Sequence, residues 1–269
     1  MENKSELLKQ LREKSGAGMV DCKKALEESG GDVNKAVEIL RKKGIAKAAK
    51  RSDREAGEGV VKVALSGDAK TGYIVEINAE TDFVVRSEKF QEFAEQVMKL
   101  IREKQPKNLA ELMALNIDGG TVKDNLDSLS GVIGEKLDIK KYEMLTSAGT
   151  VAVYSHLGGR IGVLVALGKE GQSDIAYDVA MQIAAANPKY ISPEDVAAAE
   201  LEKEKEIYKA QLLKEGKPEN MIDKIMQGKL AKFYEEVCLT KQEYIKDDSK
   251  KVEDILGGVK VEKFIRYSL

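Results

Sequence analysis

The sequence has 269 residues, 42% of them hydrophobic, which is enough to bury a core and to form more than one domain. Its 44 Lys and Arg residues nearly balance 46 Asp and Glu residues, and a net charge of -2 gives no broad electrostatic attraction for nucleic acid. It has no apolar run long enough to span a membrane and no signal-peptide apolar region, and its two distant cysteines suit a reducing compartment, so we expect a cytoplasmic protein.

Residues 1–44 have the pattern of three short helices separated by glycines. Leucines at helical spacing predict a first helix that ends near Gly16, and a second helix is predicted over residues 20–29. Asp32 is the predicted N-cap of a third helix, which Gly44 ends. The pattern of this third helix resembles the last helix of ubiquitin-associated domains. We therefore predict a three-helix ubiquitin-associated-like domain that presents a surface to a partner.

Residues 45–58 change character, because Ala, Lys, Arg and Glu follow one another without an apolar stripe. We interpret this stretch as a helical or flexible linker. We favour a solvated charged segment over a basic nucleic-acid site.

The next part of the sequence repeats one order of elements. The first copy predicts a β-hairpin made of residues 60–65 and 73–77. A helix at residues 89–101 and a third strand at residues 133–145 follow it. The second copy predicts the same elements at residues 149–154 with 160–167, 175–183 and 257–269. We therefore predict an α+β fold with two related core subdomains that have antiparallel sheets, at 59–145 and at 146–191 with 230–269.

Residues 192–229 interrupt the second copy. Ser192 followed by Pro193 predicts a helix start, a turn at 216–218 ends a charged helix, and a second apolar-striped helix returns. This pattern predicts a helical hairpin that forms an antiparallel coiled coil. Self-association or partner binding through it, and a solvated arm without a binding role, are equal alternatives.

Motifs for catalysis are missing from the sequence. It has no phosphate-binding loop of the G-x-x-x-x-G-K-[ST] type, so we expect no direct nucleotide binding. Its one histidine, His156, allows neither a two-histidine metal site nor an H-E-x-x-H motif, and no G-x-S-x-G elbow accompanies it. We expect a protein that is not an enzyme and that holds no metal and no cofactor.

Four segments in order resemble the elongation factor Ts family. Residues 11–26 are similar to the N-terminal signature of that family, residues 80–84 (E-T-D-F-V) to its T-D-F-V signature, and residues 156–165 to the signature of its second subdomain. Residues 264–267 resemble its late strand. The resemblance covers residues 5 to 269. Longer members of the family continue into a C-terminal helical module, whereas this sequence ends at Leu269.

The resemblance implies guanine-nucleotide exchange on elongation factor Tu, in which the protein binds the GDP form, displaces Mg²⁺ and promotes GDP release during translation elongation. In the family the T-D-F-V segment lies on a loop that dislodges the ion, so Thr81, Asp82, Phe83 and Val84 inherit that role. Phe83 is expected to be an apolar wedge between partner helices, and Asp82 to compete for polar contacts near the ion. The chemistry of Phe83 alone favours a core aromatic that follows a strand.

The resemblance also implies partner-binding roles for five further residues. Arg12 and Met19 are expected to contact the GTPase domain of the partner, with a solvated surface charge and a core methionine as the alternatives. Ile133, Gly134 and His156 are expected to contact its nucleotide domain. For these three, a packing residue and turn at the start of a strand, and a surface histidine, are the alternatives.

Two other functions compete with exchange. The chain could be an adaptor that uses its N-terminal helices and its coiled coil, or an RNA-binding factor that uses the lysine-rich linker. Strong salt dependence of RNA binding would indicate the latter.

Overall fold

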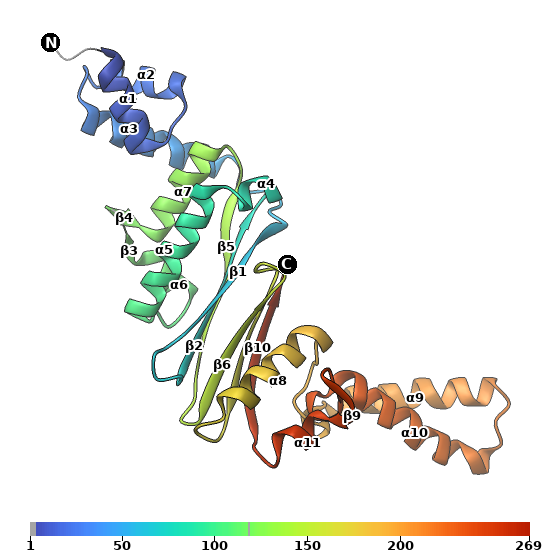
Figure 1. The fold of residues 1–269 in the computed structure, drawn as a ribbon. Helices are drawn as coiled ribbons and strands as arrows, with labels where there is room; N and C mark the ends of the chain where they lie inside the picture. The colour runs from blue at the N-terminus through green and yellow to red at the C-terminus, as the bar shows by residue number, and fades with distance from the viewer. Residues whose placement is uncertain (1–3, 118) are drawn as a thin grey trace.

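The computed structural model describes residues 4–117 and 119–269. The molecule is elongated (Figure 1): three helices lie at one end, two antiparallel sheets follow in the middle, and a pair of long helices projects at the other end. This mixture of helices and antiparallel sheets confirms the predicted α+β class.

The N-terminal helices are α1 (Lys4–Ser15), α2 (Met19–Glu28) and α3 (Val33–Ala49). Asp32 caps α3 as predicted, because its side chain accepts hydrogen bonds from the backbone N–H groups of Asn34 and Lys35. The helices enclose a small core of their own, with Leu11, Cys22, Ala25 and Ala36 at its centre.

The prediction that Gly44 ends the third helix is wrong. Helix α3 continues through Gly44 to Ala49, into the segment that was interpreted as a linker. Gly44 is buried where α3 crosses another helix, and a Cβ on it would lie 3.3 Å from the Cα of Ser128. The glycine therefore allows two helices to approach closely instead of ending one of them.

The first sheet consists of β1 (Glu58–Leu65), β2 (Thr71–Ala79) and β5 (Leu137–Thr146), with β2 in the middle. The predicted hairpin and the predicted helix, observed as α5 (Glu88–Lys104), are confirmed. Helices α5, α6 (Leu109–Ala114) and α7 (Val122–Ile133) cover one face of this sheet (Figure 1). The short strands β3 (Asn116–Ile117) and β4 (Gly120–Thr121) lead into α7.

The third strand begins later than predicted. Ile133 is the last residue of α7, Gly134 is the C-cap of that helix, and β5 starts at Leu137. Gly134 has a φ of 92°, in the left-handed region that glycine adopts at helix ends. The interpretation of Ile133 and Gly134 as the start of a strand is therefore wrong.

The second sheet repeats the first. It consists of β6 (Thr150–His156), β7 (Ile161–Leu167) and β10 (Val261–Ser268), again with the second strand in the middle. Helix α8 (Ser173–Ala186) packs on one face of it. The repeated order of elements that the sequence indicates is thus present in the two sheets.

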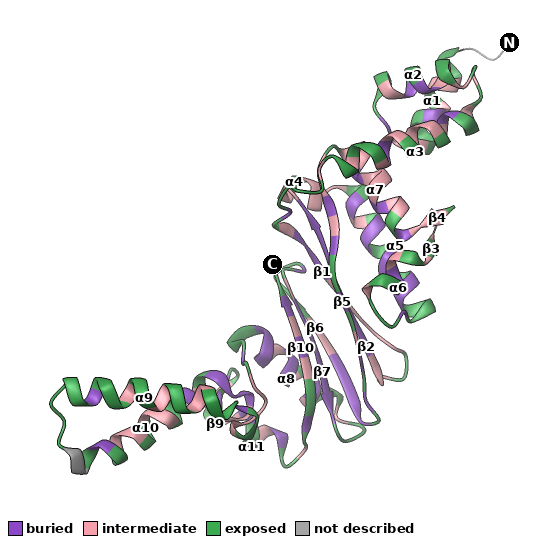
Figure 2. Ribbon diagram, turned by 180° about the vertical axis from the view of Figure 1, so that it is seen from behind, coloured by how far each residue is buried: buried purple, intermediate pink, exposed green. Residues whose placement is uncertain are grey.

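The two sheets pack against each other through the faces that their helices leave open. Val61 and Ile74 of the first sheet and Val151, Leu164 and Ile265 of the second share one buried cluster. In each sheet the middle strand, β2 or β7, is largely buried, whereas in the flanking strands β5 and β10 buried residues alternate with more accessible ones (Figure 2). The sheets therefore share one buried core at the centre of the molecule.

The inserted helices are α9 (Ala198–Lys214) and α10 (Glu219–Val237), which run side by side away from the sheets (Figure 1). The predicted helix start at Pro193 is instead a short 3-10 helix, η1 (Pro193–Asp195), and α9 begins at Ala198. Helix α10 extends to Val237, beyond the predicted boundary at 229.

The short elements η2 (Leu239–Lys241), β8 (Glu243–Tyr244), β9 (Asp247–Lys251) and α11 (Val252–Leu256) then lead back to β10. Over the described parts of the chain, no helix combines the length and the apolar character that crossing a bilayer would require.

Candidate functional site

The T-D-F-V segment forms one turn of helix, α4 (Asp82–Val85), directly after β2. The resemblance predicted a loop here, and the structure replaces it with this turn. Thr81 is the N-cap, and its hydroxyl oxygen accepts a hydrogen bond from the N–H of Val84 at 3.4 Å. The turn therefore has a defined conformation at the end of the central strand of the first sheet.

Phe83 projects from this turn into solvent, with 81% of its side chain exposed. The two following residues, Val84 and Val85, are half-buried and pack against the core of the first sheet. Asp82, on the outer side of the turn, pairs with Arg86 at 2.9 Å. The alternative of a core aromatic at Phe83 is therefore wrong, because the valines provide the inward contacts and the ring points outward.

The turn is held by the residues that follow α7. Thr81 donates its backbone N–H to Glu135 Oε2 at 3.0 Å and its hydroxyl to Glu135 Oε1 at 2.8 Å. Glu135 directly follows Gly134, so the T-D-F-V turn and the Ile133–Gly134 segment meet at one place on the surface. The fold thus brings together two of the segments that the resemblance singled out.

A second pair of contacts runs in the opposite direction. Glu80 accepts the N–H of Lys136 at 2.6 Å and pairs with Arg54 at 3.1 Å. The hydrogen bond from Lys136 is the main cause that lowers the pKa of Glu80 below its ordinary value, and the bond from Arg54 adds to it. Residues 80–81 and 135–136 therefore form a reciprocal latch, which continues the pairing of Ala79 with Leu137 past the end of the sheet.

Arg12 and Met19 lie in the N-terminal helices. Both line one shallow groove together with Lys89 of α5. Arg12 is exposed, and half of the Met19 side chain is exposed, so the alternative of a core methionine is wrong. Lys89 ties this end of the molecule to the first sheet, because its Nζ donates to the carbonyl of Gly16 at 2.9 Å.

His156 ends β6 and is exposed. Its Nδ1 lies 3.0 Å from the hydroxyl of Tyr154, whose ring stacks on the imidazole and meets Tyr177 of α8 edge-on. The following turn contacts the first sheet, since the N–H of Val61 donates to the carbonyl of Gly159 at 2.7 Å. Because β1 at Glu58 pairs with Ala79 at the end of β2, His156 and Phe83 lie toward the same end of the two sheets.

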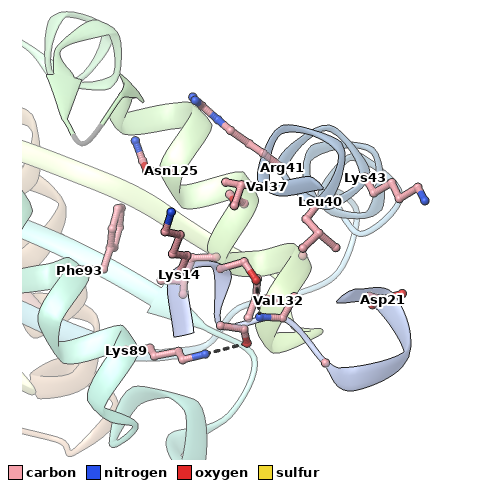
Figure 3. Close-up of a pocket in the computed structure, with 18 of the residues that line it drawn as sticks. Lys14, Asp21, Val37, Leu40, Arg41, Lys43, Lys89, Phe93, Asn125 and Val132 are labelled. Atoms are coloured by element: carbon pink, nitrogen blue, oxygen red, sulfur yellow. Dashed lines mark hydrogen bonds between the residues drawn. The ribbon is translucent and has the colours of Figure 1, made fainter. Parts of the chain in front are cut away.

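A cleft lies between the N-terminal helices and helices α5 and α7 (Figure 3). Lys89 points across it to the carbonyl of Gly16, and Arg41 on the other side donates to the carbonyl of Gly119 and pairs with Asp124 at 3.2 Å. Within residues 4–117 and 119–269, no cluster of His, Cys, Asp and Glu side chains could hold a metal ion. We therefore interpret the cleft as the junction between two parts of the fold.

Sequence reasoning did not identify Glu135 or Tyr177. Glu135 is separated from Thr81 by 54 residues, and Tyr177 belongs to a helix whose other residues form the core of the second sheet. Both are ordinary residues in their local sequence. The pairing of β2 with β5 brings Glu135 to Thr81. The packing of α8 on the second sheet brings Tyr177 to Tyr154.

Comparison with known proteins gives consistent results. A family model described as "Elongation factor TS" matches residues 80–269. A protein of Clostridium perfringens (strain SM101 / Type A) named "Elongation factor Ts" is 46% identical over 277 aligned positions, which cover 98% of this chain and 91% of the relative. A protein of Chlorobaculum tepidum with the same name is also 46% identical, over 97% of this chain and 96% of the relative. This chain therefore belongs to the elongation factor Ts family.

Proposed function

We propose that this chain is a guanine-nucleotide exchange factor that binds elongation factor Tu·GDP, displaces the Mg²⁺ ion of that partner and promotes GDP release. Membership of the elongation factor Ts family implies nucleotide exchange in translation elongation. The observation that carries the finer proposal is Phe83, an aromatic side chain that is 81% exposed on a turn fixed by hydrogen bonds to Glu135. An exposed, well-positioned aromatic ring is the kind of residue that anchors a protein interface.

The proposed mechanism is mechanical. A GTPase holds GDP with a phosphate-binding loop and with a Mg²⁺ ion that requires nearly octahedral coordination. Phe83 enters between partner helices that carry this coordination, and Thr81, Asp82 and Val84 follow it. Asp82 competes for polar contacts near the ion. This chain then needs no nucleotide pocket of its own.

The energy of the ring alone is too small for this task. Burying a Phe side chain stabilises a complex by about 1.5–3 kcal/mol. Weakening nucleotide binding about 10⁴-fold requires about 5.5 kcal/mol of differential binding. The remainder comes from a wider interface, for which we propose Arg12, Met19, Ile133, Gly134 and His156, all of them at least partly accessible in the structure. By thermodynamic linkage, GDP weakens the binding of this chain to the GTPase by the same factor, so exchange is reversible.

We propose a division of labour along the chain. The three N-terminal helices, which run to Ala49, are the ubiquitin-associated-like module, and residues 50–57 are the link. The two sheets with their helices are the two core subdomains, and α9 and α10 are the coiled-coil hairpin. Exposed apolar side chains on that hairpin, Ile207, Leu213 and Met221, support self-association through it. Sedimentation of the whole 269-residue chain measures the oligomeric state of the protein.

Release of a fluorescent GDP analogue from elongation factor Tu, at a fixed Mg²⁺ concentration, tests the proposal. Addition of this chain should accelerate release strongly, and Phe83→Ala should remove most of the acceleration. Raising the Mg²⁺ concentration should slow the catalysed reaction, because the ion competes with the exchange factor. An unchanged release rate in the presence of the wild-type chain would refute the proposed function.

A further inference from the structure

The ring of Phe83 has little packing of its own to hold it. With 81% of its side chain in solvent, its direction is set by the backbone of α4 and not by neighbouring side chains. Helix α4 has four residues, too few for a helix to be stable by its own hydrogen bonds. Whatever fixes this turn therefore fixes the direction of the Cα–Cβ bond of Phe83, and with it the side of the molecule from which the ring projects.

Thr81 is the residue that begins the turn, and its hydroxyl takes part in two hydrogen bonds. It accepts from the N–H of Val84 at 3.4 Å, which is a long and weak contact. It donates its single proton to Glu135 Oε1 at 2.8 Å, a short contact to an acceptor that is a carboxylate. Because the Thr81 hydroxyl donates its proton to Glu135, its oxygen lone pairs are free to accept from the N–H of Val84. The bond to Glu135 therefore orients the hydroxyl for the weaker capping bond.

Glu135 is itself held firmly. Its backbone carbonyl accepts the hydroxyl of Ser130 at 2.6 Å, and Ser130 is buried in α7. Its other carboxylate oxygen accepts the backbone N–H of Thr81 at 3.0 Å. Both carboxylate oxygens are thus used on one residue, the N-cap of the turn that carries Phe83.

We propose that Glu135 is a positioning residue for exchange: its carboxylate fixes the Thr81 cap, and through it the direction in which Phe83 meets the GTPase. The inference rests on the proposed function and extends it to a residue outside the T-D-F-V segment. Glu135 acts through Phe83, so its removal has no consequence for exchange once the ring is gone.

A double-mutant cycle with Glu135→Ala and Phe83→Ala in the 269-residue chain tests this, with fluorescent GDP release from elongation factor Tu as the readout. Glu135→Ala removes both hydrogen bonds that Thr81 donates to the carboxylate. It should slow catalysed release at least about tenfold, because even one hydrogen bond to a charged group is worth about that factor. In the Phe83→Ala background the same substitution should change the rate by less than about twofold. Thr81→Val removes the hydroxyl bonds to Glu135 and Val84 but keeps the backbone N–H donor, so it should also slow release. Glu135→Gln, which keeps one acceptor oxygen, should fall between the wild type and Glu135→Ala.

Glu143→Ala is the matched control. Glu143 is in β5, the strand that follows Glu135 in the chain, and it accepts a hydrogen bond from the hydroxyl of Tyr267 at 3.0 Å. Its loss should destabilise the fold without touching the turn. It should leave the rate of GDP release unchanged at a temperature at which all variants are folded by circular dichroism.

The outcomes separate the two hypotheses. If Phe83→Ala slows release and Glu135→Ala does not, the positioning role is wrong and the proposed function stands. If Glu135→Ala slows release equally with and without the ring, Glu135 acts elsewhere and the inference is wrong. If Phe83→Ala has no effect, the wedge mechanism and the inference both fail.

Discussion

Gly44 of α3 and Gly131 of α7 touch where the two helices cross, and a Cβ on Gly131 would lie 2.3 Å from the Cα of Gly44. This crossing is what attaches the N-terminal helices to the first sheet. Lys89 and Arg41 add polar contacts at its two sides, to the carbonyls of Gly16 and Gly119. The position of the N-terminal helices relative to the T-D-F-V turn is therefore set by backbone contact, which tolerates no added methyl group.

A methyl group at this crossing should separate the two helices. Gly131→Ala is expected to lower the melting temperature and to speed amide hydrogen exchange in α3, because the added Cβ overlaps with backbone that cannot move aside. The affinity for elongation factor Tu should fall as well, since Arg12 and Met19 would move away from Phe83. Calorimetric titration measures the affinity.

Gly228→Ala is the control for this substitution. Gly228 is inside α10, and a Cβ on it would meet no atom within 4 Å in the part of the chain that the structure describes. Alanine is the better helix former by about 1 kcal/mol, so this variant should be slightly more stable than the wild type. Unchanged stability and exchange in Gly131→Ala would contradict the close crossing.

Truncation of two phenylalanines in neighbouring segments should lower stability by very different amounts. Phe90 of α5 is fully buried in the core of the first sheet, so Phe90→Ala should cost about 3–5 kcal/mol of unfolding free energy. Phe83→Ala should cost less than about 0.5 kcal/mol, because its ring is in solvent. Urea unfolding measures both. A large stability loss in Phe83→Ala would show that the ring packs inside the protein.

The latch at Glu80 should make stability depend on acid pH. The pKa of Glu80 is lowered in the folded state, so the group stabilises the fold above its ordinary pKa of 4.5 and loses that contribution as the pH falls through its lowered value. Glu80→Gln, which has no charge at any pH, should melt at a lower temperature than the wild type at pH 7. The difference should shrink as the pH is lowered below 4.5. A difference that stays constant down to pH 2 would contradict this.

The left-handed conformation of Gly134 should be sensitive to side-chain type. Gly134 has a φ of 92°, so Gly134→Ala should lower the free energy of unfolding by about 1–2 kcal/mol. This loss is expected although a Cβ would meet no described atom within 4 Å. Gly134→Asn should cost less, because asparagine tolerates this region better. Thermal unfolding at pH 7 compares the two. Equal losses for both variants would mean that contacts, and not backbone conformation, account for the glycine.

The periodic parts of the fold could be predicted from the sequence because their signal is local. Two short apolar runs on either side of a turn at residues 66–68 located β1 and β2, and the apolar stripe from Phe90 to Ile101 located α5. Gly44 was misread because a glycine looks the same whether it ends a helix or lets two helices approach, and only the tertiary contact with Gly131 distinguishes these roles.

The candidate site could be predicted only as separate segments. The resemblance indicated Thr81–Val84 and Ile133–Gly134, and no sequence rule states that they lie together. Glu135 brings them together through side-chain hydrogen bonds to a residue 54 positions away. The resemblance indicated an accessible Phe83, whereas the chemistry of the residue alone favoured a core position. Local sequence could not decide, because exposure depends on which of three consecutive apolar residues the sheet core accepts, and the core accepts Val84 and Val85.

The last turn of helix α7 connects Gly131, where helix α3 crosses α7, to Glu135, which contacts the T-D-F-V turn. The length of this helix turn therefore sets the distance between the N-terminal helices and Phe83, the two proposed binding regions. Adding one residue to an α-helix rotates everything beyond it by about 100° and advances it by about 1.5 Å. An insertion between Gly131 and Gly134 would leave each binding region intact but would rotate one region relative to the other. In this protein the length of that last turn should therefore be under stricter constraint than the chemical nature of its exposed residues.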